Sequence, residues 1–247
     1  MRLDRSLFFC VAFVLTGCVT IPPSAVPAPS NSRIGVLVLV DDQPKQLYRG
    51  ATIFSHTERA NVSNWKFVDS IHAHVVSVAE GVNGQTIVRL NPTSDLVKNR
   101  LNFVKFGWSE GRFNEDLSAS VGELVADQKL NFILTVEPWE WPLPSQSNHI
   151  VHGYGVLSGC MLNFCFARGF ANVISRVYAL NPTRLVAWSI TPPYEFSIHK
   201  DVAGDIENLS ASEVDRVKLE VHGHVFTRID SAIERSGLSM KPKKPSN

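Results

Sequence analysis

The spacing of hydrophobic residues changes several times along the chain and predicts alternating strands and helices. Residues 34–40 form a continuous apolar run that ends at Asp41, as expected of a strand buried on both faces. Val68, Ile71, Val75 and Val78 then recur at helical spacing. Ser63 is suited to cap this helix and Gly81 to end it. The later patterns predict a strand over 86–90, a helix over 117–129, a strand over 131–136 and strands over 171–180 and 185–190.

The last two of these strands and the helix after them complete the predicted fold. Residues 181–184 read Asn-Pro-Thr-Arg, a turn sequence that predicts an antiparallel hairpin. Ser210 and Glu213 fit a capping box, and Gly237 is placed to end a long helix with one apolar stripe. The resulting order, β-α-β-α-β-β-β-α, predicts an α/β fold with a mixed parallel and antiparallel sheet and helices packed on it. A further short strand is expected near residues 150–156.

The chain begins with a segment that has the features of an export signal. Arg2 and Arg5 supply positive charge, and residues 7–15 form an apolar core too short to span a bilayer. The four residues Leu15-Thr16-Gly17-Cys18 follow directly.

This four-residue box resembles the lipobox of bacterial lipoproteins. The resemblance implies that residues 1–17 are removed, that the Cys18 sulfur receives a diacylglycerol and that its amine is acylated. Two or more acyl chains give stable membrane attachment. Because Val19, and not Asp, follows the cysteine, the family's sorting rule implies the outer membrane, with the body expected in the periplasm.

The rest of the chain divides into three regions by composition. Residues 18–33 are rich in proline and are expected to tether the body to the lipidated cysteine. Residues 34–238 hold the core-forming patterns and are expected to form one α/β domain. Residues 239–247 form a basic tail, interrupted by proline, that is expected to be disordered.

The order of elements behind the lipobox resembles a group of periplasmic lipoprotein domains. The group is related to the N-terminal domain of the Tol-Pal propeller protein, and it includes the curli-secretion lipoprotein and lipoprotein activators of penicillin-binding proteins. The resemblance covers residues 33–238, and residues 185–189, Leu-Val-Ala-Trp-Ser, are similar to the group's late strand. It is architectural and transfers no functional residue. A long insertion over residues 138–169 departs from the pattern.

Charge excludes one class of partner. Of 24 basic and 23 acidic side chains, residues 1–17 contain two and one, which leaves 22 of each in the mature chain. A chain with no excess of Lys and Arg offers no general attraction for nucleic acid phosphates. With 44% hydrophobic residues the chain is able to bury a large core.

Two cysteines, Cys160 and Cys165, remain as thiols after signal removal and lipidation. In an oxidising compartment they form a disulfide if the backbone brings their Cβ atoms close enough. The alternative is that both are small buried hydrophobic residues within an apolar segment. The sequence alone leaves both readings open.

The segment Glu137-Pro138-Trp139-Glu140-Trp141 suggests a second function class, glycan binding or cleavage. Indole rings stack on sugar faces, so Trp139 and Trp141 are candidate glycan contacts, with peptidoglycan as the candidate ligand. In an extended chain Glu137 points with the tryptophans and Glu140 points away, which disfavours the two carboxylates as a hydrolytic pair. The alternative is that the tryptophans pack in the core or at its rim.

No other pattern predicts chemistry. The pairs His72/His74 and His222/His224 are two residues apart on predicted helices and cannot bind one metal ion together, and His149 and His152 would need the thiols as partners. Ser158 is not in a nucleophile elbow, and no glycine-rich phosphate loop is present. We therefore expect no metal, no cofactor and no enzymatic activity.

The glycine-rich apolar stretch over residues 153–170 is the most unusual part of the predicted domain. It is either an apolar hairpin packed on its own domain or a contact for self-assembly or for a partner. We expect it to lie outside what the domain core needs. The sequence thus predicts an outer-membrane-anchored lipoprotein that acts as a non-enzymatic binding or assembly component of the cell envelope, and the alternative is a glycan-binding or glycan-cleaving protein.

Overall fold

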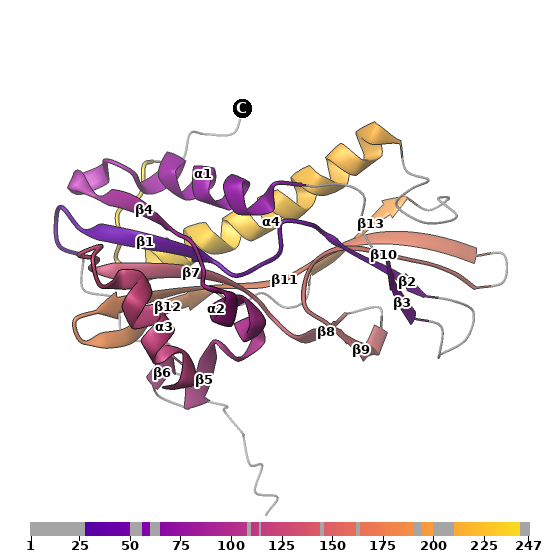
Figure 1. Cartoon of the computed structure of the whole chain (residues 1–247). Helices are drawn as coiled ribbons and strands as arrows, with labels where there is room; N and C mark the ends of the chain where they lie inside the picture. The colour runs from indigo at the N-terminus through magenta and orange to yellow at the C-terminus, as the bar shows by residue number, and fades with distance from the viewer. Residues whose placement is uncertain are drawn as a thin grey trace, which may run out of the picture.

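The computed structural model is a mixed α/β fold in which one long sheet carries helices on both faces (Figure 1). It describes residues 28–49, 56–59, 65–107, 110–113, 115–143, 146–161, 164–189, 194–199 and 210–242. The signal segment, Cys18 and most of the predicted tether lie outside these ranges. The first helix begins at Phe67, with Lys66 at the N-cap position and no side-chain cap, so the predicted cap at Ser63 is wrong. The predicted fold class is confirmed.

All eight predicted elements are present, and further strands are added between them. The helices are α1 (Phe67–Ala79), α2 (Ser94–Lys98), α3 (Glu115–Val125) and α4 (Ala211–Ser236), with 3-10 turns η1 (Val82–Gly84) and η2 (Arg100–Asn102). The predicted strands are β1 (Arg33–Val38), β4 (Thr86–Leu90), β7 (Phe132–Pro138), β11 (Phe164–Leu180) and β12 (Thr183–Ser189). The strands that the pattern did not predict, or only suggested, are β2 (Lys45–Arg49), β3 (His56–Arg59), β5 (Val104–Gly107), β6 (Glu110–Phe113), β8 (Trp141–Leu143), β9 (Gln146–Val151), β10 (Gly153–Met161) and β13 (Tyr194–His199).

Strand β11 connects the two halves of the main sheet. Its C-terminal half pairs antiparallel with β7 on one edge and with β12 on the other. Its N-terminal half pairs with β10 and β13 in the same way. The strand order of the sheet is β3-β2-β10-β11-β7-β1-β4. The strands β7, β1 and β4 therefore lie beside the C-terminal half of β11, and β10, β2 and β3 lie beside its N-terminal half.

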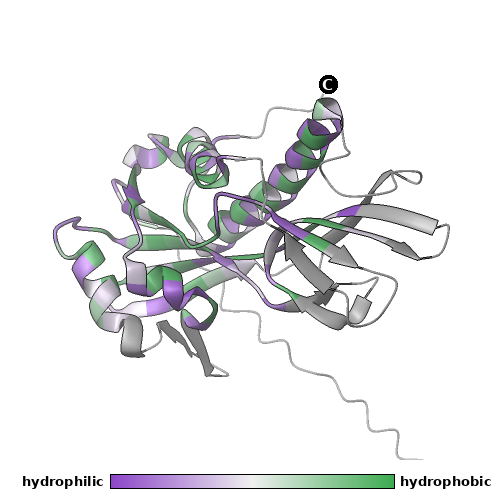
Figure 2. Ribbon diagram, turned by 45° about the vertical axis from the view of Figure 1, so that its right-hand side comes forward, coloured by the Kyte–Doolittle hydropathy of each residue, from purple (hydrophilic) through white to green (hydrophobic). Residues whose placement is uncertain are grey.

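Helices α1, and α2 with α3, cover opposite faces because the chain moves outward from β1 to β4 and then back past β1 to β7. Right-handed crossovers in opposite directions lie on opposite faces of the sheet. On one face, Ile34, Val36 and Val38 of β1 pack with residues of α1 and α4. On the other face, Leu37 and Leu39 pack in a second core with residues of α2 and α3. Figure 2 shows hydrophobic residues along the central strands and on the helix sides that face them.

Helix α4 starts and ends as its sequence predicts. The Ser210 side chain accepts a hydrogen bond from the backbone N–H of Glu213, and the Glu213 carboxylate accepts one from the Ser210 N–H at 2.8 Å. Gly237 follows the helix with φ 77°, a conformation that glycine adopts without a Cβ penalty. Every helix in the described ranges is too short or too polar to cross a bilayer.

The folded body extends beyond its predicted limits at both ends. The N–H of Ala28 donates to the carbonyl of Gly237 at 3.0 Å, so ordered contacts begin within the predicted tether. Ser239 exchanges hydrogen bonds with the Gln85 side chain, and the Lys241 N–H donates to the Val78 carbonyl at 2.8 Å. The first part of the predicted basic tail is therefore fixed to the domain.

Of the two readings of the glycine-rich stretch, packing on its own domain holds for the first half, and the expectation that the core does not need this half is wrong. Tyr154, Val156 and Leu157 of β10 are at most 2% exposed. Gly155 is required here, because a Cβ at this position would lie 1.9 Å from the Lys45 carbonyl oxygen of the paired strand β2. The pattern of glycines therefore reflects close backbone approach inside the domain.

Burial of His222 in the core makes the stability of the fold depend on pH. Its ring lies 4.8 Å from that of Phe67 and 5.6 Å from that of Phe226, and burial, aided by the charge of Lys218, lowers its pKa to about 4. The unfolded chain takes up this proton near pH 6.5. The stability contributed by the neutral ring is thus complete above pH 6.5 and is lost as pH falls toward 4.

We predict that His222→Phe, which keeps the aromatic contacts, makes unfolding less dependent on pH. Between pH 7 and 4 the wild type should lose about 2 kcal/mol more stability than the variant, after allowing for partial solvent access to the ring. Urea unfolding at a series of pH values measures this difference. Parallel curves for the two proteins would contradict it.

Candidate functional site

A buried ion pair lies at the centre of the sheet, on the face away from α1 and α4. Glu137 of β7 and Arg176 of β11 form a salt bridge between their side chains, and each is 2% exposed. Thr135, two residues before Glu137, donates a hydrogen bond to its carboxylate at 2.5 Å. Burial raises the pKa of Glu137, while the Arg176 charge and the two hydrogen bonds hold it down in part.

Strand register explains why these groups meet. Arg176 of β11 is the register partner of Thr135 of β7, and Ile174, two residues before Arg176, is the register partner of Glu137. Opposed residues of an antiparallel pair share one face, so the cation and the carboxylate lie on the same side as near neighbours. A buried charge is costly unless it is paired and hydrogen-bonded, and both conditions are met here.

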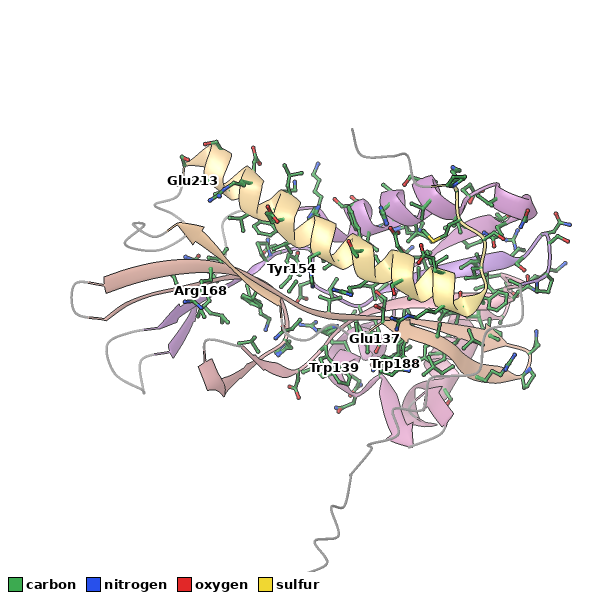
Figure 3. The ribbon with its side chains drawn as sticks, turned by 180° about the vertical axis from the view of Figure 1, so that it is seen from behind. Glu137, Trp139, Tyr154, Arg168, Trp188 and Glu213 are labelled. Carbon is green, nitrogen blue, oxygen red and sulfur yellow. The ribbon has the colours of Figure 1, made fainter. Side chains whose placement is uncertain are left out.

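Two tryptophans flank the ion pair. The Arg176 guanidinium carbon lies 5.3 Å from the centre of the Trp139 ring, within cation–π range. Trp188 of β12 is the register partner of Arg176 on its other edge. Figure 3 shows Glu137, Trp139 and Trp188 grouped together, while Tyr154 lies under α4 and Arg168 lies farther along β11. Both tryptophans are half-buried.

The structure separates the predicted tryptophan strip. Strand β7 ends at Pro138, and Trp141 begins β8, which pairs with β9 in a separate two-stranded sheet. The backbone is therefore not one extended strand from Glu137 to Trp141, and the side chain of Trp141 lies outside the described parts. Glu137 is engaged by Arg176 and Thr135, and Glu140 is exposed. Among the described side chains, Trp139 and Trp188 form the aromatic border of this site.

Sequence reasoning missed Arg176, Thr135 and Trp188. One signal was present: Arg176 is the single charged residue in the apolar stretch over residues 171–180. A lone charge in a strand buried on both faces indicates a buried partner. Its identity follows only from the pairing of β7 with β11.

The histidines that the sequence pairs contact other side chains of the domain or are buried within it. His74 of α1 bonds Asp230 of α4 through Nε2 at 2.8 Å, and its ring stacks on Phe226 at 4.2 Å. His152 lies 2.8 Å from the Lys45 ammonium. Burial lowers the pKa of His224 to about 4, aided by Arg228. Within the described ranges, no three His, Cys, Asp or Glu side chains gather as a metal site.

The two cysteines occupy opposite positions in the hairpin of β10 and β11. Cys160 is the register partner of Cys165, next to the last pair, Met161 with Phe164. The hairpin lies at the end of β11 far from Leu180, whose N–H donates to the Asn131 carbonyl near the start of β1.

Comparison with known proteins finds no matching family model and no matching curated protein. Among solved structures, the hypothetical protein CT253 from Chlamydia trachomatis aligns over 81% of this chain and 99% of its own, with 11% identity and a TM-score of 0.37. Protein XCC0632 from Xanthomonas campestris, of the family DUF330, aligns over 85% and 90%, with 9% identity and a TM-score of 0.36.

A third solved structure, described as a homologue of the neuraminyllactose-binding hemagglutinin from Helicobacter pylori, aligns over 87% of this chain and 96% of its own. Its identity is 9% and its TM-score 0.28. These low scores assign neither a family nor a function to the chain.

We predict that breaking the Glu137–Arg176 pair costs far more than breaking an exposed pair. Arg176→Met should lower the free energy of unfolding by about 3–5 kcal/mol, because it leaves a buried carboxylate uncompensated. Adding Glu137→Gln should recover part of this loss. The matched control is Arg89→Met, which breaks the exposed pair with Asp69 and should cost under about 1 kcal/mol. Equal losses from both single substitutions would refute the assignment.

Proposed function

We propose that this chain is an outer-membrane-anchored lipoprotein whose α/β body, in the periplasm, is a non-enzymatic binding or assembly component of the cell envelope. The observation that carries the proposal is a lipobox placed a short distance before one end of the folded body. The proposed anchor is the lipid on Cys18, and the long strand β11 sets the direction in which the body extends away from it.

We place the anchored end of the body at the pole that holds Ala28, the first described residue. Ala28 bonds Gly237 after the end of α4, and the Asn31 N–H donates to the Asn83 carbonyl beside β4. About ten residues separate Cys18 from Ala28. At about 3.1 Å per residue for an extended proline-rich chain, this pole stays within about 30 Å of the membrane surface.

The opposite pole is the closed end of the β10–β11 hairpin. Leu180, at one end of β11, lies beside Asn131, which in turn bonds Arg33 near the anchored pole. Phe164 is at the other end of this 17-residue strand. At about 3.3 Å per residue, the strand spans about 55 Å. A partner held in the periplasm would meet this distal pole, so we place the binding surface there.

The buried charges are consistent with a structural role in the sheet centre. Glu137 and Arg176 neutralise each other and join the two strands that carry the core. Their contribution is to fix the register of β7 against β11, and through it the direction of the hairpin. Under this proposal the chemistry of binding lies at the distal pole and not at the ion pair.

Glycan binding is the second candidate, and one observation favours it. Trp139 and Trp188 lie on one face, on either side of Arg176, and both are partly exposed. The partly exposed indole faces are suited to stacking on a sugar ring, while the buried Arg176 beneath them holds Trp139 through its cation–π contact. Peptidoglycan is the candidate ligand.

We predict that the anchor depends on Cys18. Metabolic labelling with a fatty-acid analogue should mark the wild type and not Cys18→Ser, and the variant should leave the membrane fraction. A wild type that carries no label would overturn the lipoprotein assignment.

We predict that shortening the hairpin removes partner binding without unfolding the body. Replacing residues 159–166 with Asn-Gly joins Ser158 to Ala167, which are already a register pair. The buried side chains of Tyr154, Val156 and Leu157 in β10 stay in place, so a cooperative melt should remain while co-purification of envelope proteins from solubilised membranes is lost.

The matched control for this experiment is Trp139→Ala, which should leave protein partners bound. Retained partners in the shortened variant would show that the distal pole is not the binding surface. Sedimentation with purified peptidoglycan that survives the shortening but is lost in Trp139→Ala would favour the glycan function instead.

A further inference from the structure

The register of the distal hairpin carries an inference about Cys160 and Cys165. We infer that these two residues form a redox site that becomes a cross-strand disulfide and closes the hairpin at the distal pole. The state of this site in the cell rests on the proposed export, whereas the ability to form the bond rests on the fold alone.

The backbone of the hairpin places Cys160 and Cys165 opposite each other. Nine consecutive register pairs, from Gly153 with Asn172 to Met161 with Phe164, run without a shift, and Cys160 with Cys165 is one of them. Directly opposed residues of antiparallel strands have Cα atoms about 4.5–5.5 Å apart. Disulfides join residues whose Cα atoms are about 4.4–6.8 Å apart. The register therefore places the two Cα atoms within the range that a disulfide spans.

The strands on either side hold the β10–β11 hairpin in place. The hairpin is held at its base, where Tyr154, Val156 and Leu157 are buried and β2 pairs along β10. On the other side, β13 pairs with β11 as far as Ala167. Because the flanking strands fix the register close to the cysteines, the pair is preorganised for bond formation.

The chemistry is thiol–disulfide exchange with a disulfide-bearing oxidant, either a dithiol oxidoreductase in its oxidised form or a small-molecule disulfide. The thiolate of one cysteine attacks the oxidant's sulfur, forms a mixed disulfide and releases one thiolate. The second cysteine attacks the mixed disulfide, and the second thiolate leaves. Two electrons pass to the oxidant, and the two cysteine protons end on its two sulfurs.

A bond between Cys160 and Cys165 would link the two strands at the end of the β10–β11 hairpin, which is the surface that we propose for binding. The bond encloses only four residues, so it restricts the unfolded chain less than a bond that closes a long loop. Its effect is local, because it prevents fraying of the last register pairs and presents the distal pole in one conformation. A reducing compartment would leave the tip open.

The test uses the full chain in two arms. In the first, cells are lysed into an alkylating reagent and peptide mapping counts labelled thiols at positions 160 and 165. We expect neither to be labelled until a reductant is added. In the second, purified reduced protein is mixed with oxidised glutathione, and both thiols should be lost together with formation of an intramolecular link.

A register control makes the second arm specific. In Cys165→Ser with Phe166→Cys, the new thiol is moved one position along β11 and alternates to the other face of the strand. This variant should keep both thiols free under conditions that fully oxidise the wild type.

The outcomes separate the inference from the proposed function. Free thiols in cells together with rapid bond formation by glutathione would support the site and contradict export to an oxidising compartment. Wild-type protein that stays reduced with glutathione, that links only between molecules, or that oxidises no faster than the register control would overturn the inference.

Discussion

The pairing of β11 with four other strands is the constraint on which the rest of the structure depends. β7 and β12 hold one half of β11, and β10 and β13 hold the other. Without this strand the parallel unit formed by β1, β4 and β7 would have no connection to the unit of β2, β3 and β10. α4 packs against both β11 and β12, so the longest helix also depends on it. The direction of β11 therefore sets the long axis of the molecule.

The ion pair of Glu137 and Arg176 acts within this constraint. A one-residue slip between β7 and β11 would turn Arg176 toward the apolar core under α4 and would separate it from Glu137. Such a slip would bury a charge with no partner, which is among the costliest changes a core can undergo. The pair thus gives little net stability compared with an apolar pair but penalises the wrong register strongly. Trp139 and Trp188 reduce the access of water to it.

Much of the fold could be predicted from the sequence because its central elements have strong local patterns. The apolar run before Asp41 and the capping box at Ser210 predicted β1 and α4 close to their observed bounds. β2 was missed because its sequence, Lys-Gln-Leu-Tyr-Arg, has no apolar run, and its pairing depends on β10 and on the absence of a Cβ at Gly155. Tertiary contact creates this strand.

The candidate site was less predictable because its residues come from strands that meet only in the folded sheet. Glu137 and Trp139 were identified from adjacent sequence, but Arg176 is 39 residues from Glu137 and Trp188 lies in a different strand. Only the register of β7, β11 and β12 brings them together. The strip over Glu137, Trp139 and Trp141 was inferred from an extended chain, and that geometry ends where β7 ends at Pro138.

In the proposed arrangement the body is anchored at the pole of Ala28 and presents the hairpin pole away from the membrane. The most direct measurement places a fluorescent amino acid at position 83, near the anchored pole, or at position 161, at the distal pole. The lipidated protein is then bound to vesicles whose headgroups carry an acceptor dye. We expect strong energy transfer from position 83 and weak transfer from position 161. Equal transfer from the two positions, or stronger transfer from position 161, would contradict it.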